Sequence, residues 1–344
     1  MPPKKKGNGQ KPTIRTVSEH AGVSVATVSR VLNAPLSVKE ERRNRVLESM
    51  KFLNYSPDPV ARALCTHRVR VAAIAVPNIV NPCLAEVIRG VIETLEHKGF
   101  DVLIFDSNQS IERERMFIEV LHNKIIDGVI IAAISTKELN YSELAAKTSV
   151  VVIDHPEAGH EVDLLYADDR GGMQKLVDHL ISLGHRKIGF LSGSFNSMGG
   201  VRRTESFKHA MQSAGLETSP EDIVECEWNL YGGAKGITAF LSRKTFPTAF
   251  ISASDLIAIG ALGAAYSMGF RIPRDFSITG FDHAPWSEFS IPPLTTLEYP
   301  NYRIGKEAAE CLLRRVDSPQ APRIVKKLDL PVMIRKSTGP CSLG

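Results

Sequence analysis

Hydrogen-bonding side chains follow most of the apolar, β-branched runs of this chain. In an open parallel sheet, ligands bind beyond the carboxyl ends of the strands. Hydroxyl, amide and carboxylate groups gathered there suit a small polyhydroxylated molecule, because each buried hydroxyl needs a hydrogen-bonding partner. Asp and Ser at such junctions also cap the following helix, and this alternative stays open for each residue. The residues are Asn78, Asn81, Asp106, Ser135, Asp154, Ser192, Ser194, Ser254, Asp255 and Asp282.

Two further side chains complete the chemistry of this expected site. Arg203 offers a charged fork, and Trp228 offers an apolar face on which a pyranose ring can stack.

The sequence disfavours catalysis. The chain has no G-x-S-x-G, no P-loop and no dinucleotide fingerprint followed by an acidic residue. A catalytic set of Ser192, His283 and Asp282 is imaginable. However, the adjacent residues Asp282 and His283 point in different directions from one strand end, so one is poorly placed to orient the other. We therefore expect a binding protein and no enzyme.

The segment from Thr13 to Asn33 has residue types suited to reading DNA. Its pattern predicts two short helices joined by a turn at Gly22, where a positive φ is expected. Ser24 is expected to cap the second helix, which presents Val25, Ala26, Ser29 and Arg30 outward. Short side chains let such a helix enter the major groove, and an arginine can bind guanine through two hydrogen bonds. The alternative is a helical hairpin that binds nothing.

The charge distribution favours the DNA-binding interpretation. Residues 1–70 contain 14 Lys and Arg against 5 Asp and Glu, a net charge of +9. The remaining residues contain 28 basic and 33 acidic side chains, a net charge of −5. A basic head on a mildly acidic body indicates a polyanionic partner for the head.

The elements that must position the DNA-reading helix continue to about residue 64. The S-x-x-E sequence of Ser37 to Glu40 predicts a capping box that opens a third helix. Asn54 is expected to end this helix in a left-handed conformation. Asp58 and Pro59 then start a helix of about two turns, too short to be stable alone in water. The side chains expected to pack in this unit are Val17, Ala21, Val23, Val28, Val46, Leu47, Met50 and Leu53.

The rest of the chain predicts an α/β body of two lobes. Strand and helix patterns alternate, which is typical of parallel sheets covered by helices on both faces. Amphipathic helices are expected over residues 84–97, 171–183, 203–214 and 256–267, with switches between lobes near 168–171 and 297–302. The expected strands are Val71–Val76, Val102–Phe105, Gly128–Ala132, Val150–Ile153, Ile188–Leu191, Ala249–Ala253 and Ser277–Phe281.

Several classes of protein and site are disfavoured. No apolar run approaches the roughly 20 residues of a membrane span, so we expect a cytoplasmic protein without a membrane partner. The five cysteines are odd in number and lack C-x-x-C spacing, which argues against disulfides and a zinc site. We expect no metal and no cofactor.

The run from Thr13 to Leu64 resembles the LacI family of bacterial transcription regulators, through V-S-V-A-T-V-S-R-V and the later A-R-A-L. The resemblance implies that Val25, Ala26 and Arg30 read bases, and that Leu64, with Ala61 beside it, wedges into the minor groove at the operator centre. Asp58 departs from the family's usual Asn, for which we expect altered affinity and an unchanged mechanism. The residues placed at phosphate-contacting positions are Ser24, Thr27, Ser29 and Asn33.

The body resembles the family's core, which is similar to periplasmic sugar-binding proteins. The matching phrases are V-P-N with N-P at 76–82, D-G-V-I-I at 127–131, L-G-H-R-K-I at 183–188, G-F-D at 280–282 and P-L-T-T at 293–296. Cys83 and Leu84 stand where the family often has two Phe, which removes aromatic rings from one wall. The effector-contacting positions implied by the resemblance are Asn81, Asp154, Arg203, Trp228, Ser254 and Asp282.

The sequence as a whole predicts a homodimeric repressor of carbohydrate genes. It would bind a near-palindromic double-stranded operator, with its affinity controlled by a sugar-like effector between the lobes. A periplasmic-type sugar-binding protein and a corepressor-dependent regulator are the alternatives. The expected organisation is a basic tail (1–12), a helix-turn-helix domain (13–57), a hinge (58–69) and a core (70–338). Within the core, we expect one lobe over 70–168 and 298–324 and the other over 169–297 and 325–338.

Overall fold

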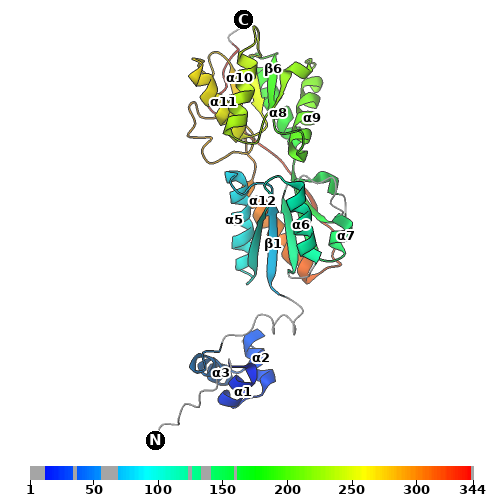
Figure 1. Ribbon diagram of the computed structural model, residues 1–344, viewed down its shortest axis with the longest axis vertical. Helices are drawn as coiled ribbons and strands as arrows, with labels where there is room; N and C mark the ends of the chain where they lie inside the picture. The colour runs from blue at the N-terminus through cyan, green and yellow to red at the C-terminus, as the bar shows by residue number, and fades with distance from the viewer. Residues whose placement is uncertain are drawn as a thin grey trace. The chain divides into compact units, whose positions relative to one another are not determined.

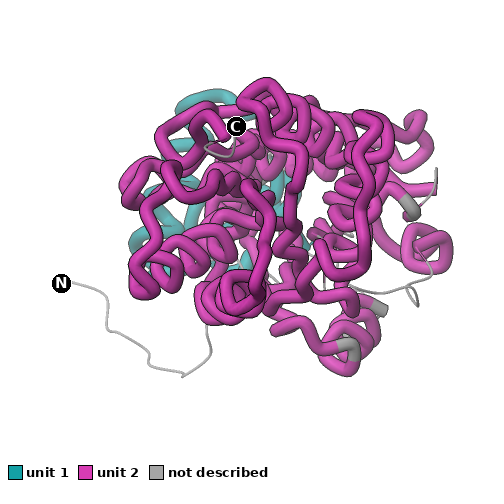
Figure 2. The backbone as a smooth tube through the Cα atoms, turned by 90° about the horizontal axis from the view of Figure 1, so that it is seen from above, with its two compact units in different colours: residues 1–69 teal, residues 70–344 magenta. Residues whose placement is uncertain are grey.

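The computed structural model describes residues 12–33, 37–55, 69–122, 126–132, 141–158 and 161–341. The chain divides into two compact units, residues 1–69 and residues 70–344 (Figure 2). Among the described residues, no helix combines the length and apolar character needed to cross a membrane.

Three helices make up the described part of the first unit: α1 (Ile14–Ala21), α2 (Val25–Asn33) and α3 (Glu40–Phe52). Gly22 ends α1 with a φ of 62°, as the turn requires. The predicted small core is present: Val17, Val28 and Val46 are fully buried, and Val23 packs against them. Leu47 is 48% exposed, because its side chain faces away from this core into water. The prediction that Leu47 packs in the core is therefore wrong.

Of the two predicted ends of α3, only the C-terminal one agrees with the structure. The helix begins at Glu40, and Lys39 precedes it without a side-chain cap. The predicted capping box from Ser37 to Glu40 is therefore wrong, because Ser37 lies in a separate turn before the helix. Asn54 follows the helix with a φ of 51°, which confirms the predicted left-handed conformation.

The first lobe of the second unit is a six-stranded parallel sheet in the order β11-β5-β4-β3-β1-β2. Alternate residues of each strand face opposite layers. In β1, Ala72 and Ile74 pack with α5 and α12, and Ala73 packs with α6 and α7 on the other face (Figure 1). The elements are β1 (Val71–Val76), α5 (Pro82–Glu96), β2 (Asp101–Asp106), α6 (Ile111–His122), β3 (Gly128–Ala132), α7 (Tyr141–Ala145), β4 (Ser149–Ile153), β5 (Asp163–Ala167), α12 (Asn301–Asp317) and β11 (Val325–Leu328), with a short 3-10 turn at Pro156–Ala158.

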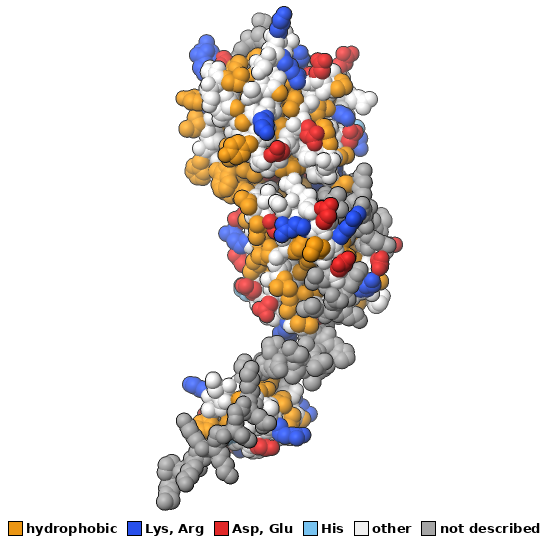
Figure 3. Space-filling model, in the orientation of Figure 1, with side chains coloured by type: hydrophobic (Ala, Val, Ile, Leu, Met, Phe, Trp, Pro, Cys, Tyr) orange, Lys and Arg blue, Asp and Glu red, His pale blue; other side chains and the backbone are white. Residues whose placement is uncertain are grey.

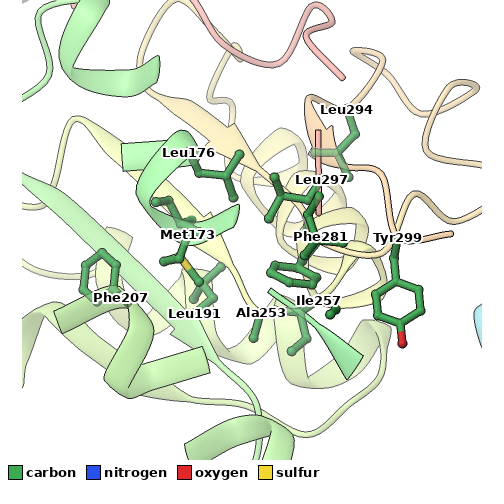
Figure 4. Close-up of a cluster of buried hydrophobic side chains, with 14 of the residues drawn as sticks. Met173, Leu176, Leu191, Phe207, Ala253, Ile257, Phe281, Leu294, Leu297 and Tyr299 are labelled. Atoms are coloured by element: carbon green, nitrogen blue, oxygen red, sulfur yellow. The ribbon is translucent and has the colours of Figure 1, made fainter. Parts of the chain in front are cut away.

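The second lobe has a four-stranded parallel sheet in the order β7-β6-β8-β9. Its core combines aliphatic and aromatic side chains from strands and helices, as Figure 4 shows for Phe207, Leu191 and Phe281. The elements are α8 (Asp169–Ser182), β6 (Ile188–Ser192), α9 (Met198–Ser213), a 3-10 turn (Pro220–Asp222), β7 (Ile223–Glu225), α10 (Leu230–Leu241), β8 (Ala249–Ser252), α11 (Asp255–Ser267), β9 (Ser277–Thr279), and the antiparallel pair β10 (Thr296–Leu297) and β12 (Val332–Met333).

The chain crosses between the lobes three times: from β5 to α8, from β10 to α12 and from β11 to β12. The third crossing corrects a predicted boundary. Residues 325–328 were expected in the second lobe, but β11 pairs with β5 at the edge of the first sheet. Its sequence, V-K-K-L, lacks the apolar run by which the inner strands could be identified, because an edge strand is only half covered.

One helix pair in each lobe is packed at glycines. A Cβ on Gly90 of α5 would lie 2.2 Å from the Tyr302 carbonyl oxygen, and one on Gly305 of α12 would lie 2.1 Å from that of Val87. In the second lobe, a Cβ on Gly233 of α10 would lie 2.0 Å from the Ile257 carbonyl oxygen. The backbones of these helices therefore touch, which no other residue type would permit.

Gly260→Ala tests this packing in α11. The new methyl group would meet the Leu230 carbonyl oxygen at 1.9 Å, so α10 would have to shift. We expect the free energy of unfolding to fall by about 1–3 kcal/mol in urea titrations. Gly263→Ala, on the same helix with nothing within 4 Å of the added atom, is the control and should be neutral or stabilising by up to about 1 kcal/mol. Equal losses in the two variants would contradict the backbone contact.

Candidate functional site

The exposed side of α2 is the candidate nucleic-acid interface. Thr27 donates its backbone N–H to Ser24 Oγ at 3.2 Å, which confirms the predicted cap. Ser24, Val25, Ala26 and Arg30 are exposed, and Thr27 and Ser29 are half-buried. Val28 and Val31 are buried on the opposite side of the helix. Short side chains and one arginine therefore face outward together, as a helix entering the major groove requires.

Other predicted DNA-contacting residues are less fully described. Asn33 is the last residue of α2, and nothing further is described of its side chain. Ala61 and Leu64, with the whole predicted hinge helix from Asp58, lie outside the described residues.

The second candidate site is a cavity of about 170 Å³ between the two lobes of the body. The first lobe contributes the loop after β1, the start of α5, Glu114 of α6 and the end of β4. The second lobe contributes the loop after β6, the start of α9, Trp228 and Asp282. Tyr299 and Asn301, at a crossing between the lobes, complete the wall. The cavity therefore lies where the strand ends were expected to converge.

The structure brings together five of the six residues predicted to contact an effector: Asn81, Asp154, Arg203, Trp228 and Asp282. Ser254 does not line the cavity. It is 3% exposed, and its Oγ accepts the backbone N–H of Ile257 at 3.2 Å as the cap of α11. The capping alternative therefore describes this residue.

Of the other polar residues at strand ends, some line the cavity and others do not. Asn78 and Ser194 line the cavity. Ser192 and Asp255 are buried behind its wall, Asp106 lies apart from it, and Ser135 is outside the described residues.

Arg203 is held at the centre of the wall. Its Nη1 lies 3.0 Å from Asp282 Oδ1 and also donates to the Ala253 carbonyl oxygen. The guanidinium lies 3.7 Å from the centre of the Phe281 ring and 5.7 Å from that of Trp228, within the range of cation–π contacts. The Arg203 charge is thus paired with the Asp282 carboxyl group and lies against two aromatic rings.

Arg202 connects the lobes. Its Nε donates to Asp169 Oδ2 within the second lobe, and its Nη1 donates to the backbone carbonyl oxygen of Asp154 at 2.6 Å in the first. Asp154 accepts the Tyr299 hydroxyl at Oδ2 and the Ala167 backbone N–H at Oδ1. The Tyr299 hydroxyl points away from the hydrophobic cluster on which its ring packs (Figure 4). The two lobes therefore share one buried hydrogen-bonded network.

Burial raises the pKa of two carboxyl groups near this network. The pKa of Asp255 rises to about 8, because burial and the nearby Asp282 both disfavour its charged form. The pKa of Asp282 rises to about 6, because burial outweighs the opposing effect of Arg203. Asp255 is held by the Thr296 hydroxyl and the Ala284 backbone N–H, each at 2.6 Å.

The imagined catalytic set is not assembled. The Ser192 hydroxyl donates to the Gly193 carbonyl oxygen and shares a hydrogen bond with Thr204 at 2.7 Å. His283 Nε2 lies 2.9 Å from Arg335 Nη2, so its hydrogen bond goes to a different residue. No nucleophile and base face each other here.

Sequence reasoning missed seven polar residues of the wall: Gln109, Glu114, Asn196, Ser197, Arg202, Tyr299 and Asn301. Arg202 is adjacent to Arg203, which the sequence analysis selected for the site. Two consecutive arginines near the start of a helix are therefore a usable signal for a binding residue. Tyr299 and Asn301 lie between β10 and α12, in a crossing that the sequence analysis placed only approximately. Glu114 gave no local signal, since a glutamate on a helix usually faces water.

A helix-turn-helix unit and a two-lobed α/β body with a polar cavity, in one chain, define a ligand-responsive DNA-binding regulator. Two family descriptions match these parts: "Bacterial regulatory proteins, lacI family" over residues 13–58 and "Periplasmic binding protein-like domain" over residues 177–338. The chain belongs to the lacI family of bacterial regulatory proteins, whose members are DNA-binding transcriptional repressors. The family, the two-part fold and the regulatory function predicted from sequence are thereby confirmed.

Relatives match along nearly the whole chain. The HTH-type transcriptional repressor PurR of Mannheimia succiniciproducens is 30% identical over 327 residues, with 94% of this chain and 98% of the relative covered. The ribose operon repressor of Haemophilus influenzae is 31% identical over 325 residues, with the same coverage.

Solved structures show the same architecture. A complex of the regulator CelR with cellobiose has a TM-score of 0.72 at 25% identity, covering 95% of this chain and 99% of that one. The lac repressor dimer bound to operator and the anti-inducer ONPF has a TM-score of 0.86 at 24% identity, covering 96% and 100%. This second likeness concerns the fold.

Asp255→Asn tests the buried carboxyl. Between about pH 4 and 8 the folded chain keeps a proton that the unfolded chain has released, so the free energy of unfolding falls as pH rises. The amide can still accept from Ala284 and donate to Thr296, so we expect a folded variant whose Tm falls less steeply from pH 5 to 8. Asp101→Asn, at an exposed position, is the control. A wild-type slope in the Asp255 variant would show that this group does not titrate in that range.

Proposed function

We propose that this protein represses genes of carbohydrate uptake or catabolism and that a sugar-like effector in the interlobe cavity controls its affinity for the operator. The observation that carries this proposal is the cavity wall, in which hydrogen-bonding side chains from both lobes surround the aromatic ring of Trp228. Such a wall suits a ring with several hydroxyls. Two similar proteins support the class of ligand, namely the ribose operon repressor and the CelR–cellobiose complex.

The DNA contacts come from α2 and the hinge. We assign base reading to Val25, Ala26 and Arg30, whose exposure supports this role. Leu64, with Ala61, would wedge into the minor groove, where an apolar side chain unstacks and bends the duplex. The residues assigned to phosphate contacts are Ser24, Thr27, Ser29 and Asn33.

The protein acts as a homodimer on a near-palindromic operator. Three large apolar side chains near one another in sequence stay exposed in the second lobe: Trp286 at 47%, Phe289 at 79% and Ile291 at 85%. On the face of the body shown in Figure 3, hydrophobic side chains gather near the junction of the lobes. Exposed apolar patches of this kind mark protein interfaces, and a two-fold dimer matches the two-fold symmetry of an operator.

The effector acts by binding one arrangement of the lobes better than another. Its cavity has walls on both lobes, so its affinity depends on how far apart they lie. The hydrogen bonds from Arg202 to Asp154 and from Asn301 Nδ2 to the Asp282 carbonyl oxygen, at 3.0 Å, cross the same junction. The protein has no catalytic role in this scheme, and it works in the cytoplasm, where its DNA is.

Arg30→Ala tests the α2 interface. On an operator selected from random sequences, we expect a loss of about 10- to 100-fold in affinity, because one bidentate base contact is worth about 1–3 kcal/mol. Random duplex should lose much less. Affinities are measured by fluorescence anisotropy at 50 and 200 mM salt, where a steep fall is expected for the wild type. Lys98→Ala, at an exposed position on the body, is the control. Equal losses on both duplexes would refute base reading by Arg30.

Trp228→Ala tests the cavity. A panel of mono- and disaccharides is first screened by thermal shift on the wild-type protein, since a ligand of the native state raises Tm. For the sugar that binds, we expect the variant to lose about 10- to 100-fold in affinity, because the apolar face is removed. It should also lose the sugar's effect on operator binding and keep its ligand-free operator affinity. Tyr266→Ala, a 75% exposed aromatic away from the cavity, is the control. An unchanged response in the Trp228 variant would place the effector elsewhere.

A further inference from the structure

The indole N–H of Trp228 is hydrogen-bonded within the protein. Its Nε1 donates to Ser197 Oγ at 3.0 Å. An indole has this one polar hydrogen and no acceptor. Trp228 therefore offers only the apolar part of its ring to the cavity that it lines, and the hydroxyls of a sugar must find their partners on other side chains.

Ser197 is itself fixed by three hydrogen bonds through its hydroxyl group. The hydroxyl donates to the Ser194 carbonyl oxygen at 2.7 Å, and it accepts the backbone N–H of Gly200 at 3.1 Å as the N-cap of α9. The bond from Trp228 is the second one that it accepts. Since a hydroxyl has one hydrogen to donate and two acceptor sites, this one is fully used. The start of α9 therefore determines where the indole N–H lies.

Gly193, in the loop after β6, lies against one face of the same ring. A Cβ on this glycine would lie 2.0, 2.3 and 2.5 Å from three consecutive atoms of the six-membered ring of Trp228. A point beside the ring edge would be close to one atom and clearly farther from its neighbours, so these similar distances place the Gly193 backbone over the ring face. One face of Trp228 is therefore covered by backbone, and a ligand can stack only on the other.

These contacts all belong to one lobe. Gly193 and Ser197 lie between β6 and α9, and Trp228 lies between β7 and α10, in the second lobe. The turn before Ser197 is joined to the end of β7, because Glu225 Oε1 accepts the backbone N–H of Phe195 at 2.7 Å. The ring thus moves with the second lobe and keeps its orientation when the first lobe moves.

We propose that Gly193 and Ser197 are positioning residues of the effector site, which hold the Trp228 ring as a one-sided stacking platform for a sugar ring. This inference rests on the proposed function, since it names how that site presents its aromatic face. Ser197 fixes the edge of the ring that carries the N–H, and Gly193 supports the covered face. A side chain that is already ordered loses little conformational entropy when a ligand stacks on it, so the platform binds more tightly than a free ring would.

Ser197→Gly tests the hydrogen bond. Glycine is tolerated at an N-cap, so we expect α9 to form and Tm to fall by only about 1 °C. The tryptophans of the chain are Trp228 and Trp286, so a Trp286→Phe background makes the fluorescence report Trp228 alone. Without its anchor, Trp228 should be quenched more strongly by acrylamide and should emit at longer wavelength. The affinity for a sugar that binds should fall by about 3- to 10-fold, as for the loss of one hydrogen bond.

Two further variants separate the anchor from the cap. Ser197→Thr restores a hydroxyl and should restore the wild-type spectrum and sugar affinity. Ser254→Gly makes the same substitution at the N-cap of α11, which does not line the cavity, and is the matched control. It should leave the Trp228 spectrum and the sugar affinity unchanged.

Gly193→Ala tests the covered face. The added methyl group would push the ring away from residue 193, into the space that a ligand would use, because the Trp228 side chain is the partner in this contact that can move. We expect a changed Trp228 emission spectrum in the ligand-free protein. The sugar affinity should fall by about tenfold or more, as for other overpacked contacts.

The sugar probes are D-ribose, D-glucose, D-galactose and cellobiose, measured by thermal shift and isothermal titration on the full-length protein. A wild-type spectrum and wild-type quenching in Ser197→Gly would overturn the anchor, whichever sugar binds. A changed spectrum with unchanged sugar affinity would overturn the platform as part of the effector site. The Ser197 variants decide the question if Gly193→Ala does not fold.

Failure of the proposed function has a different signature. If no probe raises the wild-type Tm while the operator is still bound, the proposed carbohydrate function fails, and the sugar-stacking role fails with it. The ligand-free spectra then still decide whether Ser197 and Gly193 hold the Trp228 ring.

Discussion

The structure of the body depends on one constraint, that charges buried at the junction of the lobes must be paired. Removing a guanidinium or a carboxylate from water costs several kcal/mol unless a partner replaces the lost hydration. Arg202 and Arg203 satisfy this requirement with Asp169 and Asp282, and Arg202 also reaches the backbone of Asp154 in the other lobe. A change in the position of one lobe against the other must therefore break or rebuild buried hydrogen bonds. Such a junction favours a small number of discrete arrangements over a continuous range.

The packing within each lobe directs movement to that junction. The helix pairs α5–α12 and α10–α11 are in backbone contact at glycines, which leaves no space for the helices to slide closer. Close-packed interiors resist deformation, so a lobe moves as a unit. Three crossings of the chain join the two lobes, and the cavity lies beside them. A ligand that touches both walls then acts on the junction at which one lobe can move against the other.

Elements of the fold could be predicted from the sequence where the residue pattern marks them clearly. Strands buried on both faces read as continuous apolar runs, and β1 and β3 begin and end where the sequence analysis placed them. Edge strands such as β7 (I-V-E) and β11 (V-K-K-L) are short or half-exposed, and they were missed. Helices that were expected, such as α5 and α11, differ from their predicted bounds by one or two residues.

The residues of the candidate cavity also divide into those that could be predicted from the sequence and those that could not. Strand-end residues such as Asn81 and Asp282 could be chosen locally, because every parallel strand ends on the same side of its sheet. Ser254 shows why this reasoning also selects residues outside the wall: an N-cap serine and a ligand-binding serine have the same sequence signature. Glu114 shows the reverse, because its position in the wall follows from how α6 packs on the sheet and from no local pattern. The resemblance to a family supplied positions, and only tertiary structure showed which of them share one wall.

The location of the cavity explains why binding there can control a separate unit of the same chain. A ligand enclosed within one lobe would stabilise that lobe equally in every arrangement and would shift no equilibrium. A ligand whose partners lie on both lobes has a different affinity for each arrangement, and this difference is the free energy available for regulation. A coupling of about 1–3 kcal/mol changes operator affinity by about 5- to 150-fold. Because linkage is reciprocal, the operator must change the affinity for the effector by the same factor, so the sign of that change distinguishes an inducer from a corepressor.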